Sequence, residues 1–305
     1  MSSAFWISQS PLSDPGNDPK LLEAINALPS DIASLRDIVS QFCLHYQARR
    51  SEVRPDRLDE IHTRYAGVMF ERILSRNPSL TAKRSSDERT VGCCRDSALL
   101  LASILRQKGI PARIRIGSAA YFSPGKMIDH TVTEMWDADL KRWRLVDPDM
   151  PVGWKKYAYG KQVDFLDLRP GIDFQNGSEA WLSARSGEID ASNYIIGESV
   201  AFKGLPYLAV NVQSDLAAMN KQEMLLWDLW GIGAECTPDS MPDEMIPVAD
   251  EISMSLIDRE IEPEKIQQFM QRSNLALTEE ILRLDPNSPA AGPKKVNVAR
   301  ALGKV

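Results

Sequence analysis

Apolar residues recur at helical spacing in the first third of the chain. Residues 59–75 carry one such stripe and predict a helix, and residues 98–105 are apolar on almost every side, which indicates a central helix covered all round. Gly109 followed by Pro111 predicts where this central helix ends. An earlier helix is predicted to begin behind Ser30, a residue type that favours the N-cap. Its apolar stripe consists of Ile32, Leu35, Ile38, Val39, Phe42 and Tyr46.

From residue 112 the apolar pattern changes to strict alternation. Ile114, Ile116 and Ser118 alternate with Arg113, Arg115 and Gly117. This alternation predicts a half-buried strand. Residues 131–136 and 142–146 predict two further strands, joined by the short polar loop 137–140.

The second half of the chain predicts mostly helices. The expected elements are a strand at 208–212, a helix at 216–230, a proline-containing linker at 236–243, and amphipathic helices near 245–260 and 263–283. The end, from residue 288, is small, polar and basic, and we expect it to be loosely held. We therefore predict two domains. Residues 1–235 would form the main domain, with core motifs at 90–150, and residues 236–305 a linker, a helical extension and the basic tail.

Composition narrows the possible partners. The 305 residues are 43% hydrophobic and 26% charged, which is typical of a globular protein. Thirty-six basic and 42 acidic residues give a net charge of −6, so neither nucleic acid nor a membrane is expected as a partner. The chain has no apolar stretch of about 18 residues and no signal-peptide pattern at its start, so we expect a soluble, cytoplasmic protein.

Cysteine and histidine are few. The chain has four cysteines, at positions 43, 93, 94 and 236, and three histidines, at positions 45, 62 and 130. A structural zinc site needs four ligands that usually arrive in close pairs, and the sequence contains no Cys-x-x-Cys. We expect no metal site and no cofactor.

One arrangement of residues is typical of nucleophilic catalysis. Cys94 lies where the central helix begins, a position that favours a thiolate. A turn centred between residues 138 and 139 would place His130 opposite Asp147 and Glu134 opposite Trp143, on one face of the sheet. A nucleophilic cysteine needs a histidine to hold its proton and a carboxylate to orient that histidine.

The same segments resemble the transglutaminase-like superfamily. GCCRDSALLL (92–101) and LRQKGIPAR (105–113) are similar to the cysteine helix of that family, while DHTVTEMW (129–136) and WRLVDP (143–148) resemble its histidine and aspartate motifs. The resemblance covers roughly residues 90–150 and implies a papain-related α+β fold. With the apolar patterns described above, we predict a cysteine-bearing helix packed on an antiparallel sheet, N-terminal helices and a helical C-terminal extension. The resemblance also implies a Cys94, His130 and Asp147 triad, with Cys94 rather than Cys93 as nucleophile because one residue separates the family's glycine from its cysteine.

Three functions remain open at this point. The chain could transfer an acyl group through a thioester to an amine or water, act as an amidase or peptidase, or serve as a non-catalytic binding scaffold. The expected substrate is a peptide, a protein side chain or a small acyl or amine compound, with Glu134, Trp136 and Trp143 as candidate substrate-binding residues. The sequence does not determine the oligomeric state.

Overall fold

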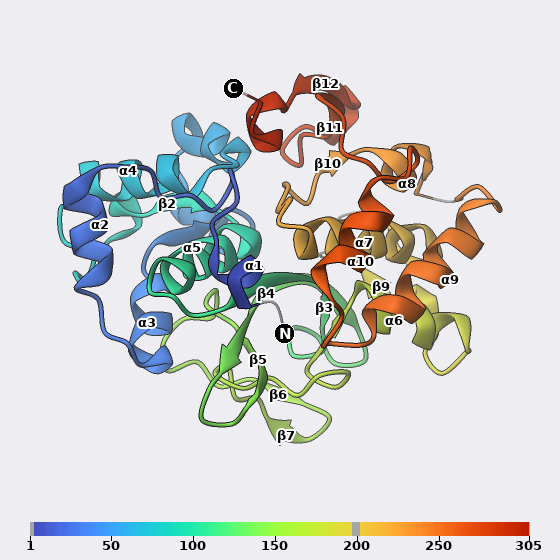
Figure 1. Cartoon of the computed structure of the whole chain (residues 1–305), viewed down its shortest axis with the longest axis horizontal. Coiled ribbons are helices and arrows are strands. Elements are labelled where there is room, and N and C mark those ends of the chain that lie inside the picture. Colours follow the sequence, from blue (N-terminus) through green and yellow to red (C-terminus); the bar gives the residue numbers. More distant parts are fainter. Residues whose placement is uncertain (1–2, 197–201, 239, 305) are drawn as a thin grey trace.

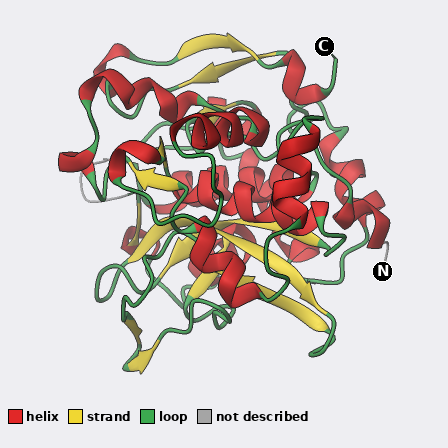
Figure 2. Cartoon of the chain, turned by 90° about the vertical axis from the view of Figure 1, so that its left-hand side faces the viewer, coloured by secondary structure: helices red, strands yellow, loops and turns green. Residues whose placement is uncertain are grey.

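The largest sheet among the described residues has five strands (Figures 1 and 2). The computed structural model describes residues 3–196, 202–238 and 240–304. The strands follow the order β5-β4-β3-β8, with β9 beside β4, and all pairs are antiparallel except β4 with β9. Their bounds are β3 (Ala112–Ala119), β4 (Met127–Asp137), β5 (Arg142–Val146), β8 (Phe174–Asn176) and β9 (Tyr194–Ile195).

The central helix α5 (Cys94–Gln107) packs on this sheet. Every residue from Cys94 to Arg106 is buried, and Ile114, Ile116 and Met135 belong to the same apolar cluster as the helix. Gly109 follows the helix with φ +75°, the left-handed conformation that ends helices. The predicted α+β fold, with a cysteine-bearing helix on an antiparallel sheet, is confirmed.

The N-terminal third forms short helices around α5. These are α1 (Ser3–Ile7), α2 (Pro19–Asn26), α3 (Ile32–Val39), α4 (Ala66–Arg76) and the 3-10 turns η1 (Arg50–Glu52), η2 (Pro55–His62) and η3 (Ser86–Glu88). Asp31, rather than Ser30, caps α3 by accepting the Ser34 N–H at 2.8 Å.

Two predicted helices are shorter than their apolar stripes. α3 ends at Val39 because the following chain pairs as β1 (Cys43–His45) in parallel with β2 (Thr90–Gly92). The helix predicted over 59–75 is divided into η2 and α4. Between them, buried Arg64 lies in extended chain and donates from Nε to Asp228 Oδ2 at 2.8 Å, a contact far away in sequence.

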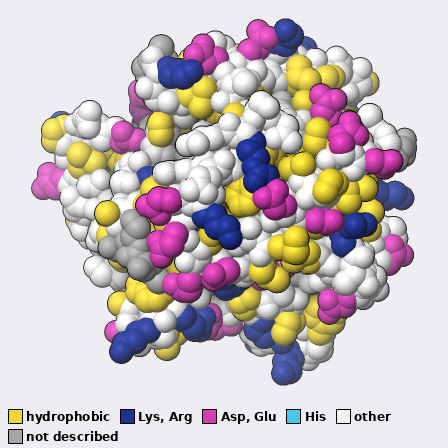
Figure 3. All heavy atoms as spheres, turned by 45° about the vertical axis from the view of Figure 1, so that its right-hand side comes forward, with side chains coloured by type: hydrophobic (Ala, Val, Ile, Leu, Met, Phe, Trp, Pro, Cys, Tyr) yellow, Lys and Arg dark blue, Asp and Glu magenta, His cyan; other side chains and the backbone are white. Residues whose placement is uncertain are grey.

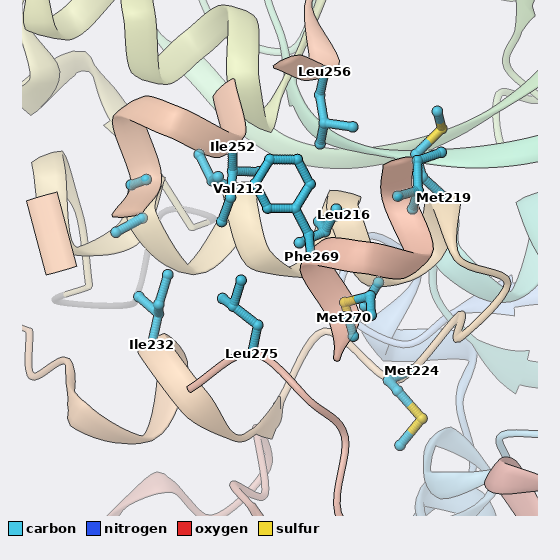
Figure 4. Close-up of a cluster of buried hydrophobic side chains, with 14 of the residues drawn as sticks. Val212, Leu216, Met219, Met224, Ile232, Ile252, Leu256, Phe269, Met270 and Leu275 are labelled. Carbon is cyan, nitrogen blue, oxygen red and sulfur yellow. The ribbon is translucent and has the colours of Figure 1, made fainter. Parts of the chain in front are cut away.

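The C-terminal half packs around α7 (Gly204–Met219). α6 (Gly177–Arg185), α8 (Gly231–Glu235), α9 (Met245–Leu256) and α10 (Pro263–Met270) surround it, and Figure 4 shows side chains of α7 to α10 in one cluster. The strand predicted at 208–212 is wrong, because these residues are helical. Every residue from Tyr207 to Met219 except Ser214 is buried, so the helix has no polar face to reveal its period.

The amphipathic helix predicted near 245–260 is present as α9, and the predicted linker 236–243 holds no helix or strand among its described residues, but the other predictions for this half need correction. The helix predicted at 216–230 ends at Met219, and Lys221 behind it has φ +58°. The chain then forms a three-stranded sheet from β10 (Asp228–Leu229), β11 (Glu280–Arg283) and β12 (Lys294–Asn297), followed by η6 (Ala299–Leu302). The helix expected near 263–283 therefore stops at Met270, and the tail expected to be loose is paired in a sheet. The predicted domain boundary at residue 235 stays a prediction.

β3 is buried on both faces, not on one. All eight of its residues are buried, including Arg113 and Arg115. Both arginines donate to Glu134 Oε2, at 2.7 and 3.1 Å, and Arg115 also binds Asp215 Oδ2 at 2.7 Å. The alternation of apolar residues with arginine thus marks a buried ion cluster rather than a solvated face.

No helix in the described part of the chain is long and apolar enough to cross a membrane.

We predict that Glu134→Ala destabilises the fold by about 3–5 kcal/mol, because it leaves buried arginines without their counter-charge. The free energy of unfolding from urea titration measures this. Glu280→Ala is the matched control, since Glu280 pairs with Lys295 on the surface and its loss should have no measurable effect. Equal stabilities of the two variants would contradict the prediction.

Candidate active site

Cys94 is the first residue of α5, and Cys93 is the N-cap. The Cys93 N–H donates to Asp96 Oδ2 at 2.9 Å, which ties the first turn together. The N–H groups at the start of a helix have no acceptor within the helix, so the Cys94 N–H lies beside its own thiol as a free donor for an anionic oxygen.

The environment of the Cys94 thiol differs from the sequence expectation. Cys94 is 3% exposed. Its contact with the Cys93 thiol, its burial and the charges of Asp149 and Asp129 raise the pKa of the Cys94 thiol well above 9.0. The helix N-terminus acts in the opposite direction but does not outweigh them. The surroundings of Cys94 therefore favour the neutral thiol over the thiolate.

His130 lies on β4 between the stretches that pair with β9 and with β5. It is opposite Gly117 of β3, where a Cβ would lie 2.0 Å from the Gln175 backbone oxygen of β8, so only glycine fits. The His130 Nε2 atom is 2.9 Å from Asp147 Oδ2. The predicted hydrogen bond is present, and Nδ1 remains as the nitrogen for exchanging a proton with a nucleophile.

The strand register that produces this bond is not the predicted one. Glu134 is opposite Leu145, and Trp143 is opposite Trp136. The loop is 138–141 rather than 137–140, because the Asp137 carboxylate accepts two N–H groups inside the turn and Lys141 takes φ +52°. The shift is two positions, so side chains keep their faces and His130 still reaches Asp147 just beyond β5.

A family comparison covers all three predicted catalytic residues. Residues 57–148 match the family model of the transglutaminase-like superfamily. This stretch is a transglutaminase-like superfamily domain. Superfamily members are mostly cysteine enzymes. The match begins in η2, well before the motifs at 90–150, so it includes α4 and β2. A search of curated proteins gives no significant match.

Within the transglutaminase-like domain, Asp147 is fully buried and held by three donors. His130 and the Tyr121 hydroxyl share Oδ2, at 2.9 and 2.6 Å, and the Asp149 N–H binds Oδ1 at 2.9 Å. Burial alone would raise the pKa of Asp147, but the His130 charge and these hydrogen bonds lower it. The carboxylate is thus ionised and fixed in orientation.

Sequence reasoning missed Tyr121 and Asp149. Tyr121 comes directly after the β3 strand motif and carries no signal of its own. Asp149 follows Asp147 by two residues and accepts from Ser97 Oγ of α5 at 3.0 Å. It therefore joins the aspartate segment to the first turns of the cysteine helix.

His130 titrates above its ordinary range. Burial acts to lower the pKa of His130, while the Asp147 charge and hydrogen bond, with Asp149 and Asp129, raise it above 6.5. The same two aspartates raise the pKa of Cys94, so the histidine and the cysteine share their charged neighbours. Among the described residues, no hydrogen bond joins His130 to Cys94. The described residues thus include an assembled His130–Asp147 pair that makes no hydrogen bond to the Cys94 thiol.

The three candidate substrate-binding residues, Glu134, Trp136 and Trp143, contact other side chains of the protein. Glu134 is fully buried, and although burial acts to raise the pKa of its carboxyl, Arg113, Arg115 and Arg259 lower it to about 2. The Trp136 and Trp143 rings contact each other edge to face at 5.8 Å, and Arg113 stacks on Trp143 at 3.9 Å. These contacts leave Glu134 occupied by arginines, so the structure gives no support for an amine-binding role.

Removal of the Tyr121 hydroxyl should strengthen the His130–Asp147 pair. Tyr121→Phe takes away one of the two donors on Oδ2, so we predict a further rise in the pKa of His130, whereas Asp147→Asn should lower it. The chain has only three histidines, so imidazole NMR titration can follow each one. His45 and His62 serve as internal references. An unchanged pKa of His130 in Tyr121→Phe, or a raised pKa of His130 in Asp147→Asn, would contradict this account.

Proposed function

We propose that the transglutaminase-like domain transfers acyl groups through a thioester on Cys94. The acyl donor is an amide, ester or thioester, and the acceptor is an amine or water. The observation that supports this most is the His130–Asp147 hydrogen bond, set beside a helix that begins at a cysteine. A peptide, a protein side chain or a small molecule can each supply such a carbonyl.

The proposed reaction has two displacements. His130 takes the Cys94 proton as Sγ bonds to the carbonyl carbon, and the Cys94 N–H stabilises the resulting oxyanion. The carbonyl re-forms as the bond to the leaving amine, alcohol or thiol breaks, and His130 returns the proton to that group. Water or an amine then attacks the thioester while His130 accepts its proton. The Cys94 sulfur leaves and recovers that proton, which restores the free thiol.

In the proposed reaction, His130 has to remove the proton of the Cys94 thiol. A neutral thiol is a poor nucleophile, so attack needs His130 in its neutral form. Since the pKa of His130 is raised, the reaction should accelerate as the pH rises through that pKa and should slow below it.

Burial favours one alternative, a non-catalytic scaffold. Cys94 and His130 are each 3% exposed and Asp147 is 0% exposed, so a substrate carbonyl cannot reach them without movement. A groove of about 640 Å³ lies between the N-terminal segment and α4, away from these residues. An enzyme must open over Cys94, whereas a scaffold need not.

Alkylation with a chloroacetamide separates the two functions without a known substrate. We predict that Cys94 is the fastest-labelled cysteine by peptide mass spectrometry and that His130→Ala lowers its rate on the order of 100-fold, the typical contribution of a general base. Asp147→Ala should lower the rate too, and Asp147→Asn should retain part of it. Cys236, which is half-buried on the segment after α8, is the internal reference and should not change.

The opposite pattern would contradict the proposal. If Cys94 reacts no faster than buried Cys43, or if His130→Ala leaves its rate unchanged, the domain is a scaffold. Faster labelling of Cys93 than of Cys94 would identify Cys93 as the nucleophile instead of Cys94.

Metal removal should have no effect. The proposed steps use only protein groups, so we predict that excess chelator leaves both Cys94 labelling and turnover unchanged. Loss of labelling that calcium or zinc restores would show that a metal site takes part.

A further inference from the structure

A short hairpin carries an unusual concentration of exposed apolar side chains. The loop 151–162, here called the aromatic hairpin, contains β6 (Tyr157–Ala158) and β7 (Lys161–Gln162). Its exposed fractions are 52% for Val152, 52% for Trp154, 59% for Tyr157 and 71% for Tyr159. Large apolar side chains exposed together mark a binding surface more often than chance does.

The same hairpin is basic in an acidic protein. It carries Lys155, Lys156 and Lys161 and no acidic residue, a local charge of +3, so the rest of the chain carries −6 − 3 = −9. Lys156 Nζ lies 5.4 Å from the Trp154 ring centroid. The hairpin is therefore positively charged, although the net charge of the whole chain is negative.

The hairpin is anchored at its base and projects at its tip. Val163, at the base of the hairpin, and Ala158, which precedes the turn, are both buried in a cluster with Tyr121 and Phe165. Tyr159 (φ +49°) and Gly160 (φ +74°) form the tight turn at the tip. The hairpin lies at the lower end of the molecule in Figure 1, and the lower margin of Figure 3 carries basic and hydrophobic side chains with some acidic ones between them.

We propose that the aromatic hairpin binds the surface of an anionic lipid bilayer. Tryptophan and tyrosine are enriched at the membrane interface, where the ring is buried and the polar atom stays hydrated. Lysine beside them is attracted to anionic headgroups, and an aliphatic residue such as Val152 gains from burial among acyl chains. This proposal differs from the prediction, made from the net charge, that the protein has no membrane partner.

The shape of the patch favours a bilayer over a soluble polyanion. A projecting tip contacts a plane with few residues, whereas a nucleic acid strand needs a basic groove that follows its backbone. A long polyanion leaving this hairpin would meet the acidic remainder of the protein and be repelled. Binding through a hairpin needs no spanning helix, and it does not depend on the proposed acyl transfer.

Vesicle flotation of the full chain tests the proposal. We expect binding to vesicles of equal parts phosphatidylcholine and phosphatidylglycerol, weaker binding in high salt, and little binding to phosphatidylcholine alone. Trp154 is the one exposed tryptophan among the seven, because Trp136 is half-buried and the others are buried. Brominated lipid should therefore quench the wild-type fluorescence and leave Trp154→Phe nearly unaffected.

Matched variants assign the binding to the hairpin. Lys155→Gln and Lys161→Gln should each lower the partition coefficient about fivefold, which corresponds to about 1 kcal/mol per lysine at the surface. The double variant Trp154→Ser, Tyr159→Ser should lower it at least about tenfold. Lys83→Gln and the double variant Met254→Ser, Ile257→Ser are the controls, because they change exposed residues elsewhere and should bind as wild type does.

Three outcomes would overturn the proposal. The first is no binding to anionic vesicles at low salt, and the second is binding that the hairpin variants leave unchanged. The third is hairpin-dependent binding to single-stranded DNA or polyglutamate with none to vesicles, which would assign a soluble polyanion instead. Cys94 labelling in the same variants should stay at the wild-type rate, so failure here is distinguishable from failure of the acyl-transfer proposal.

Discussion

The hydrogen bond between His130 Nε2 and Asp147 Oδ2 is the interaction on which the rest of this account depends. It joins the middle of β4 to the residue after β5, so it exists only if those two strands keep a register of the correct parity. The Asp137 turn sets that register, and Gly117 lets β8 approach the opposite side of β3 at the level of His130. Tyr121 and Asp149 then hold the carboxylate in place.

Burial affects both this pair and the Cys94 thiol. A low-dielectric site makes the attraction between His130 and Asp147 larger, which keeps the imidazole oriented. The same burial, together with Cys93 and the nearby aspartates, favours the neutral form of the Cys94 thiol. Under the proposed acyl transfer, His130 would have to act as a base and the residues that bury Cys94 would have to move before a substrate reaches it. The Ser97–Asp149 hydrogen bond links the aspartate segment to α5.

Local chemistry made the core of the fold predictable from sequence. The central helix, its glycine stop and the three-stranded meander follow from apolar periodicity and turn residues alone, and the pairing of His130 with Asp147 follows from the parity of a short loop. The β4–β5 register failed on a local feature, the Asp137 turn, whereas the other main failures depended on burial and on contacts distant in sequence. Residues 208–212 of α7 predict a strand because burial on every side removes the helical period. Arg113 and Arg115 predict a half-buried strand because their partners, Glu134 and Asp215, lie on other elements. Tyr121 had no recognisable pattern, since its role appears only when β3 and β5 are brought together.

Acyl-enzyme formation with p-nitrophenyl acetate tests the central claim most directly. The account predicts a burst of p-nitrophenolate and the mass of one acetyl group on the Cys94 peptide, with both absent in Cys94→Ser and both slowed in Asp147→Ala. Acetyl groups found only on lysines, or on Cys94 at a rate that His130 and Asp147 variants do not change, would contradict it.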